Sequence, residues 1–174
     1  PGAGRLILGH EMFGRVFQVG SQVSSLQPGD LVVATVRRGC RQCVSCREGR
    51  SDFCYTGLHR ERGIELEDGF MTQWIVEEEV NLIPVPQHLE DVGVLIEALA
   101  TVEKAVEMAA TFQRRLLPPC SHSEHAYDTP NWGVHKRTLV AGAGPMGILG
   151  AFILRARGAE TYVIATQPPD SVRG

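Results

Sequence analysis

Four cysteines crowd into a short stretch of this chain, and their spacing constrains the fold more than any other feature. They follow the pattern Cys40-x2-Cys43-x2-Cys46-x7-Cys54. Four thiolates this close together suit a tetrahedral zinc ion, and a site closed by four sulfurs has no open position for chemistry. We therefore predict that residues 37–63, which show no helical or strand period, form a lobe around a structural zinc ion.

Two other interpretations of these cysteines stay open. A bacterial ferredoxin-type iron–sulfur cluster would need three residues between the third and fourth cysteines, with proline next. Here the gap is seven residues and Tyr55 follows Cys54. The cysteines could also be unligated core side chains. Disulfides are less expected, because the chain shows no secretory signal and its five cysteines are an odd number.

A glycine-rich motif lies near the other end of the sequence. The strand-like run 138–141 precedes it and the apolar, helix-like run 148–154 follows it, ending near Gly158 before a second strand over 161–165. In this context the first glycine makes a tight turn, the second admits a pyrophosphate and the third lets helix and strand pack. A glycine turn without a ligand is the alternative. The motif comprises Gly142, Ala143, Gly144, Pro145, Met146 and Gly147, with the proline suited to a first helical position.

The end of the second predicted strand bears on the choice of dinucleotide. An acidic residue commonly stands there and binds the ribose hydroxyls of NAD. This chain has Thr166, Gln167 and Pro168 at that place, and Asp170 comes slightly later. The missing carboxylate leaves room for the 2′-phosphate of NADP, with Arg173 as a possible partner.

A second metal site is suggested by residues far apart in the sequence. His10 and Glu11 follow the apolar run 6–8, and Glu97 lies within a helical pattern over 90–111, where an unpaired carboxylate would be costly. A catalytic zinc ion needs about three protein ligands of this kind and one open position. Taken singly, each residue also suits an ordinary surface or core position.

The remaining pattern is rich in short strands before the helix. Strand-like runs cover 6–8, 15–19 and 31–34, and strand character returns over 70–85. Residues 113–137 are polar and rich in proline, and they are expected to be a solvated linker or excursion. The order of elements is therefore a β-rich part, a long helix and an unfinished β-α-β unit.

Composition narrows the class of partner. The net charge is -3 and the sequence pI about 6.1, with no basic stripe that would suggest nucleic acid. No apolar stretch approaches the roughly 20 residues of a membrane span. We expect a cytoplasmic protein that acts on a small molecule.

Taken together and in this order, Gly9-His10-Glu11, the cysteine lobe and the glycine loop resemble the zinc-dependent medium-chain alcohol dehydrogenase superfamily. Local strings are similar to its glucose 1-dehydrogenase branch; they lie at 36–40, 52–57, 68–71 and 102–105.

The resemblance implies an α/β fold in two domains. Residues 1–98 would be a GroES-like β-barrel catalytic domain, truncated at its N-terminus and carrying the zinc lobe 37–63. Residues 99–174 would be a linker helix and the start of a Rossmann doubly wound parallel sheet, truncated at its C-terminus.

It also implies roles for individual residues. His10 and Glu97 would bind catalytic zinc, with Glu11 as an alternate ligand, and Glu61 and Glu97 would contact the sugar. The structural zinc would be held by Cys40, Cys43, Cys46 and Cys54. The cofactor would be NADP or NAD, contacted by residues 142–147 and by Thr166, Gln167 and Pro168.

The implied activity is the oxidation of D-glucose to gluconolactone by a homo-oligomeric full-length enzyme, the present segment alone being inactive. The alternatives are a zinc dehydrogenase of another polyol or alcohol, and a non-catalytic zinc-binding fragment. Several family residues are missing or replaced. A cysteine ligand and a proton-relay Ser or Thr would precede Gly9, and Val36 and Thr101 replace sugar-contacting Asn and Asp residues.

Overall fold

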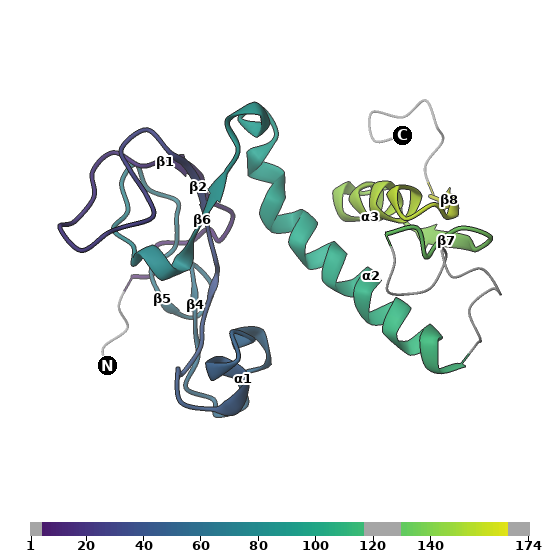
Figure 1. The fold of residues 1–174 in the computed structure, drawn as a ribbon, viewed down its shortest axis with the longest axis horizontal. Helices are drawn as coiled ribbons and strands as arrows, with labels where there is room; N and C mark the ends of the chain where they lie inside the picture. The colour runs from purple at the N-terminus through teal and green to yellow at the C-terminus, as the bar shows by residue number, and fades with distance from the viewer. Residues whose placement is uncertain (1–4, 117–129, 167–174) are drawn as a thin grey trace. The chain divides into compact units, whose positions relative to one another are not determined.

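The computed structural model describes residues 5–116 and 130–166 (Figure 1). The chain divides into two compact units, which comprise residues Pro1–Glu97 and Ala98–Gly174. Within the described residues, no helix has the length and apolar character that crossing a membrane requires.

The first unit is built on a small antiparallel sheet. Strand β2 (Leu31–Ala34) lies between β1 (Phe13–Arg15) and β6 (Leu82–Val85). All four residues of β2 are buried, as their apolar composition predicts. On one face, Leu31, Val33 and Val85 form a core cluster that Phe13, Leu89 and Ile96 cover. This packing fixes the start of helix α2 (Ile96–Leu116) beside the sheet.

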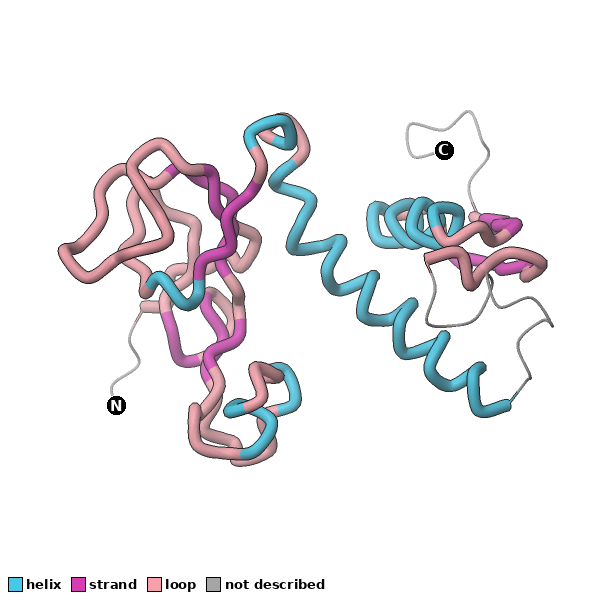
Figure 2. Tube along the Cα trace, viewed as in Figure 1, coloured by secondary structure: helices cyan, strands magenta, loops and turns pink. Residues whose placement is uncertain are grey.

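Most of the rest of this unit is loop, as Figure 2 shows. A second sheet has the order β3-β4-β5, and short helical turns join the elements. The elements are β3 (Arg37–Arg38), α1 (Val44–Arg47), η1 (Ser51–Phe53), β4 (Arg60–Arg62), β5 (Leu66–Glu67), η2 (Glu79–Asn81), η3 (Gln87–Leu89) and η4 (Gly93–Leu95).

Several strand predictions for this unit are wrong. Residues 6–8 form no strand, because their backbone makes only a few hydrogen bonds to the segment around Gly69. The amide of Ile7 donates instead to the carboxylate of Asp68. Of the run 15–19 only its first residue belongs to a strand, and the run 70–85 is extended as a strand only in β6. Composition predicts an extended backbone for these segments, but a β-strand also needs a neighbouring strand of matching length with which to form hydrogen bonds.

The second unit contains the predicted strand–loop–helix–strand order. Strands β7 (Arg137–Ala141) and β8 (Glu160–Ile164) are parallel, and helix α3 (Pro145–Ala156) connects them. Its core contains Val106, Ala110, Trp132 and Ile153. The prediction of a solvated linker over 113–137 is wrong at both ends, since α2 continues to Leu116 and Trp132 is only 7% exposed. The middle of that segment lies outside the described residues.

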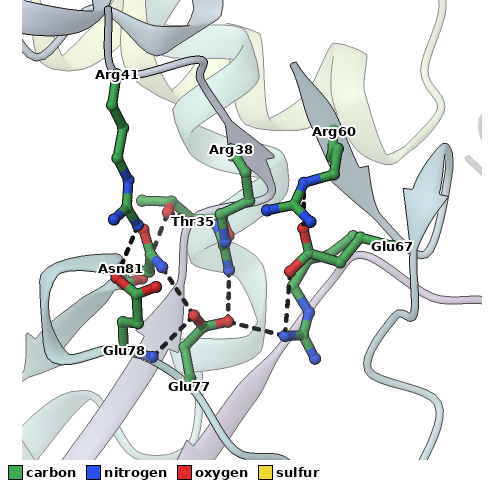
Figure 3. Close-up of polar contacts among 9 residues, drawn as sticks. Thr35, Arg38, Arg41, Arg60, Glu67, Glu77, Glu78 and Asn81 are labelled. Carbon is green, nitrogen blue, oxygen red and sulfur yellow. Dashed lines mark hydrogen bonds and ion pairs between the residues drawn. The ribbon is translucent and has the colours of Figure 1, made fainter. Parts of the chain in front are cut away.

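A buried ionic network supports the β3-β4 pair in the first unit (Figure 3). Oε2 of Glu77 lies 2.6 Å from Nη2 of Arg38 and 3.1 Å from Nη1 of Arg62. Its other oxygen accepts hydrogen bonds from Nδ2 of Asn81 at 2.8 Å and from the amide of Glu78 at 3.0 Å. The side chains of Arg38 and Glu77 are each 6% exposed and that of Arg62 is 12% exposed.

Burial raises the pKa of Glu77, but the hydrogen bonds from Asn81 and Arg38 and the charge of Arg38 outweigh it. The pKa therefore lies below its ordinary value of 4.5. A carboxylate with a depressed pKa contributes stability above its unfolded-state pKa, and this contribution disappears as the pH falls through the folded-state pKa.

We expect Glu77→Gln to lower the free energy of unfolding by about 3 kcal/mol at neutral pH, because it removes the counter-charge of the buried Arg38 guanidinium and one of the two carboxylates that face the partly buried Arg62. The difference from wild type should shrink as the pH falls below 4.5. Denaturant titrations at several pH values measure both effects. Glu78→Gln is the matched control, since the Glu78–Arg41 pair is 62% and 65% exposed and should contribute less than about 1 kcal/mol.

Candidate metal and dinucleotide sites

The four cysteines of the lobe surround one point. Their four Sγ atoms all lie within 4.8 Å of one another, and Sγ of Cys40 is 3.9 Å from Sγ of Cys46. Sulfurs placed about 2.3 Å from a zinc ion at the corners of a tetrahedron stand roughly 3.8 Å apart. Cys43 and Cys54 are buried, and all four thiols are free of disulfides. The arrangement fits the predicted zinc ion, although the ligand assignment itself stays a prediction.

Local backbone geometry brings these sulfurs together. Arg41 adopts a left-handed φ of 59°, which turns the chain directly after Cys40. The amide of Cys43 then donates a hydrogen bond to Sγ of Cys40 at 3.3 Å. A Cβ atom on Gly39 would stand 2.4 Å from Sγ of Cys46, so only glycine allows this approach.

Hydrogen bonds in the lobe favour ionised sulfur, the form that binds metal, at Cys40 and Cys54. Hydrogen bonds from the side chain of Thr56 and from the backbone of Cys43 and Gln42 lower the pKa of Cys40 to about 5. The Thr56 hydroxyl likewise lowers the pKa of Cys54, whose sulfur it contacts at 3.4 Å. Burial raises the pKa of Cys46 to about 12. A metal ion among the sulfurs would displace the proton from Cys46.

The second predicted ligand set also comes together in space. Ligand atoms of His10, Glu11 and Glu97 all lie within 4.8 Å of one another. His10 and Glu97 are partly buried, and Glu11 is exposed. One imidazole and two carboxylates form a donor set that suits zinc. The geometry is compatible with the predicted site, and its metal assignment stays a prediction.

The backbone directly before His10 is held by two segments, one around Gly63 and one around Gly69. The carbonyl oxygen of Gly9 accepts the amide of Phe70 at 2.8 Å. A Cβ atom on Gly63 or Gly69 would stand 2.1 or 2.2 Å from that same oxygen. Glycine at positions 9, 63 and 69 therefore allows these backbone segments to approach more closely than side chains would permit. This approach fixes the position of the backbone directly before His10.

The electrostatics at this site favour a cation. Burial raises the pKa of Glu97, the charge of His10 opposes that effect, and the charge of Glu11 adds to it, so that the pKa lies above its ordinary value. A divalent ion would reverse this balance by neutralising two neighbouring carboxylates.

The predicted sugar contact Glu61 lies on β4, opposite Arg37 of β3. Its carboxylate is 3.2 Å from Nη1 of Arg37, and both side chains are partly buried. Glu61 does not line the larger of two described cavities, about 640 Å³, which Glu11, Phe17 and Trp74 border. The pairing with Arg37 was not predicted.

The glycine loop surrounds a separate cavity of about 490 Å³ in the second unit. Gly142 has a φ of +115°, and a Cβ atom on Gly147 would stand 2.0 Å from the oxygen of Gly142. A Cβ atom on Gly144 would instead meet no atom within 4 Å, so this glycine is required by nothing in the fold. Pro145 takes the first turn of α3, as predicted. The cavity is lined by Ala141, Gly142, Ala143, Gly144, Ile164, Ala165 and Thr166.

The other predicted cofactor contacts have mixed outcomes. Met146 lies in the first turn of α3 and is not among the residues that line the described cavity. Gln167 and Pro168 lie outside the described residues. No carboxylate stands between the end of β8 and Thr166.

Some residues of these sites were not found by sequence reasoning. Thr56 lies within the stretch 52–57, which was used only for its similarity to the glucose 1-dehydrogenase branch. A hydroxyl two residues after a cysteine can nevertheless indicate a hydrogen bond to its sulfur. Glu77 is one of three consecutive glutamates, and nothing in the sequence distinguishes the buried one.

Comparison with known proteins agrees with this geometry. Residues 1–87 match the family model of the alcohol dehydrogenase GroES-like domain. The chain belongs to this family, and with it to the zinc-dependent medium-chain dehydrogenases.

Its relatives narrow the resemblance to glucose 1-dehydrogenases. The chain is 43% identical to the glucose 1-dehydrogenase of Methanocella arvoryzae over 99% of its own length and 44% of that protein. It is 40% identical to the Metallosphaera sedula enzyme, over 99% of this chain and 45% of that one. The chain thus spans less than half the length of these relatives.

A solved structure shows the same arrangement of elements. The Haloferax mediterranei glucose dehydrogenase, determined in complex with NADP, zinc and gluconolactone, superposes with a TM-score of 0.74 at 28% identity. The match covers 95% of this chain and 43% of that one.

We expect Cys54→Ser to remove the metal ion from the lobe, because a hydroxyl is a poor replacement for a thiolate in a four-sulfur site. Elemental analysis of purified protein should show one zinc ion fewer per chain than in wild type. Ser45→Ala, which changes a residue between two of the ligands, should leave the zinc content unchanged. Equal zinc content in Cys54→Ser and wild type would contradict the assignment.

Proposed function

We propose that the full-length protein is a zinc-dependent NAD(P) oxidoreductase that oxidises D-glucose to gluconolactone. The observation that carries the proposal is the meeting of His10, Glu11 and Glu97 in the same chain as a four-cysteine cluster and a Gly-x-Gly-x-x-Gly cavity. The names of the relatives supply the substrate class.

Each site has a distinct part in this proposal. His10 and Glu97 would hold a zinc ion that supplies Lewis-acid chemistry to the substrate hydroxyl, with Glu11 as an alternate ligand. Glu61 would contact the sugar, and its ion pair with Arg37 would keep the carboxylate oriented. The four cysteines would hold the second ion closed to substrate.

The glycine loop would bind the dinucleotide, which accepts the hydride. The N-terminus of α3 presents backbone amides and a partial positive charge to a pyrophosphate. Thr166 lines the described cavity where NAD-specific proteins commonly have an acid, and this supports NADP.

Two glycine substitutions separate binding from folding. We expect Gly144→Ala to weaken NADPH binding about tenfold while leaving the melting temperature nearly unchanged, because the new methyl group meets open space in the fold. Gly147→Ala should lower the melting temperature, because its methyl group would meet the oxygen of Gly142. NADPH fluorescence titration and thermal unfolding measure these effects. Tight NADPH binding by Gly144→Ala would contradict the assignment of the cavity.

The activity itself is tested on the full-length protein with D-glucose and NADP. We expect NADPH formation that disappears after zinc removal and returns when zinc is added back. Two zinc ions per chain are expected, whereas a non-catalytic zinc fragment would hold one. A panel of other sugars, polyols and simple alcohols tests the substrate. A zinc-loaded protein that oxidises none of them would overturn the proposal.

Two further parts of the proposal concern the setting of the enzyme. We expect a homo-oligomer in the cytoplasm, which size-exclusion chromatography with light scattering and cell fractionation can test.

A further inference from the structure

The two candidate metal sites lie in the same unit, and one buried carboxylate contacts a segment next to each. Glu77 accepts hydrogen bonds from Arg38, two residues before Cys40, and from Arg62, on β4. Neither arginine is a candidate ligand. Arg38 lies two residues before the first cysteine, and Arg62 precedes Gly63, which closely approaches the carbonyl oxygen of Gly9.

Arg38 connects Glu77 to the cysteine lobe. Its Nη1 donates to the Thr35 hydroxyl at 2.9 Å, while its Nη2 contacts Glu77 at 2.6 Å, so both ends of the guanidinium are fixed (Figure 3). Gly39 follows and packs directly against Sγ of Cys46. A displacement of Arg38 would therefore move the backbone that contacts the sulfurs.

Arg62 connects Glu77 to the segment before His10. Its guanidinium lies over the ring of Phe70, 4.8 Å from the centroid. The neighbours of these two residues, Gly63 and Gly69, form the close contacts with the carbonyl oxygen of Gly9. The amide of Phe70 donates to that oxygen at 2.8 Å. His10 is the next residue along the chain.

We propose that Glu77 is a positioning residue shared by both candidate metal sites. It acts through Arg38 on the cysteine cluster, and through Arg62 and Phe70 on His10. The second effect rests on the proposed function, whereas the first requires only that the cysteines bind a metal ion.

The contacts of Glu77 explain why its charge matters and not only its shape. All four of its neighbours are donors: two guanidinium groups, the amide group of Asn81 and a backbone N–H. Glutamine has one acceptor oxygen, and its NH2 group would face donors on the other side. Glu77→Gln therefore disturbs the positions of both arginines, and it removes a charge that Arg38 faces directly and that Arg62 shares with Glu67.

The test measures metal release in the full-length, zinc-loaded protein. We expect Glu77→Gln to transfer zinc to a chromophoric chelator on the order of ten times faster than wild type at both sites, the size of effect typical of residues that support metal ligands. Glu77→Asp should restore part of the difference. Glu78→Gln, which alters the exposed neighbour paired with Arg41, should release zinc at the wild-type rate.

Cobalt substitution gives a readout that overall stability would not change. The sulfur-to-cobalt absorption band reports the cysteine lobe, and we expect its intensity or position to change in folded Glu77→Gln but not in Glu78→Gln. Leu26→Ala, which truncates a buried side chain outside the network, is the stability control. If it released zinc as fast as Glu77→Gln at equal folded fraction, release would follow general unfolding and the proposal would be wrong.

The outcomes separate this proposal from the proposed function. Equal release from Glu77→Gln and Glu78→Gln overturns the positioning role even where the wild type oxidises glucose. If the wild-type protein binds zinc in the cysteine lobe alone, the proposed function is wrong. The effect of Glu77 on the cysteine cluster is then tested by the cobalt absorption band alone. If Glu77→Gln does not fold, Glu77→Asp is compared with Glu78→Gln, and unchanged release in the aspartate variant contradicts the proposal.

Discussion

The contact of Glu77 with the buried Arg38 and the partly buried Arg62 is the interaction on which the first unit most depends. Its sheets are short and loops make up most of it, so regular hydrogen bonding fixes few of its segments. An ion pair removed from water is stabilising only where geometry and additional hydrogen bonds offset the cost of desolvation. Glu77 meets that condition because both of its oxygens are fully used. Arg38 on β3 and Arg62 on β4 are thereby linked through one carboxylate.

Glycine serves two different purposes in this chain. The contacts that a Cβ atom would make at each position distinguish them. At Gly63 and Gly69 a side chain would collide with backbone atoms, so these residues permit a close approach within the fold. Gly147 belongs to the same class, because its neighbour is the oxygen of Gly142. A Cβ atom on Gly144 would meet none of the described atoms within 4 Å, so packing in the described part of the chain does not require glycine there. The motif therefore divides into glycines that the packing requires and one that it does not, and the proposed dinucleotide would account for the latter.

Local patterns predicted local structure well, and contacts between distant segments were beyond them. The cysteine cluster and the β7-α3-β8 unit follow from spacing because their members are close in sequence, and β2 follows from its continuous apolar run. The strands expected at 6–8 and 70–81 were wrong because strand composition does not reveal whether a partner is available. Glu77 could not be distinguished from Glu78 and Glu79, since its burial depends on Arg38 and Arg62. The meeting of His10 and Glu97 was expected only from their chemistry and the resemblance.

The two ligand sets differ in a way that follows from their surroundings. In the cysteine lobe, hydrogen bonds from Thr56 and backbone amides favour thiolates at Cys40 and Cys54, burial raises the pKa of Cys46, and two of the four cysteines are buried. At the other set the donors are a histidine and two carboxylates, one of them exposed, and burial together with the charge of Glu11 raises the pKa of Glu97. A saturated, enclosed cluster suits a permanent structural ion. A partly open one suits an ion that must still accept a substrate oxygen, and the proposed function therefore places the chemistry at His10 and Glu97.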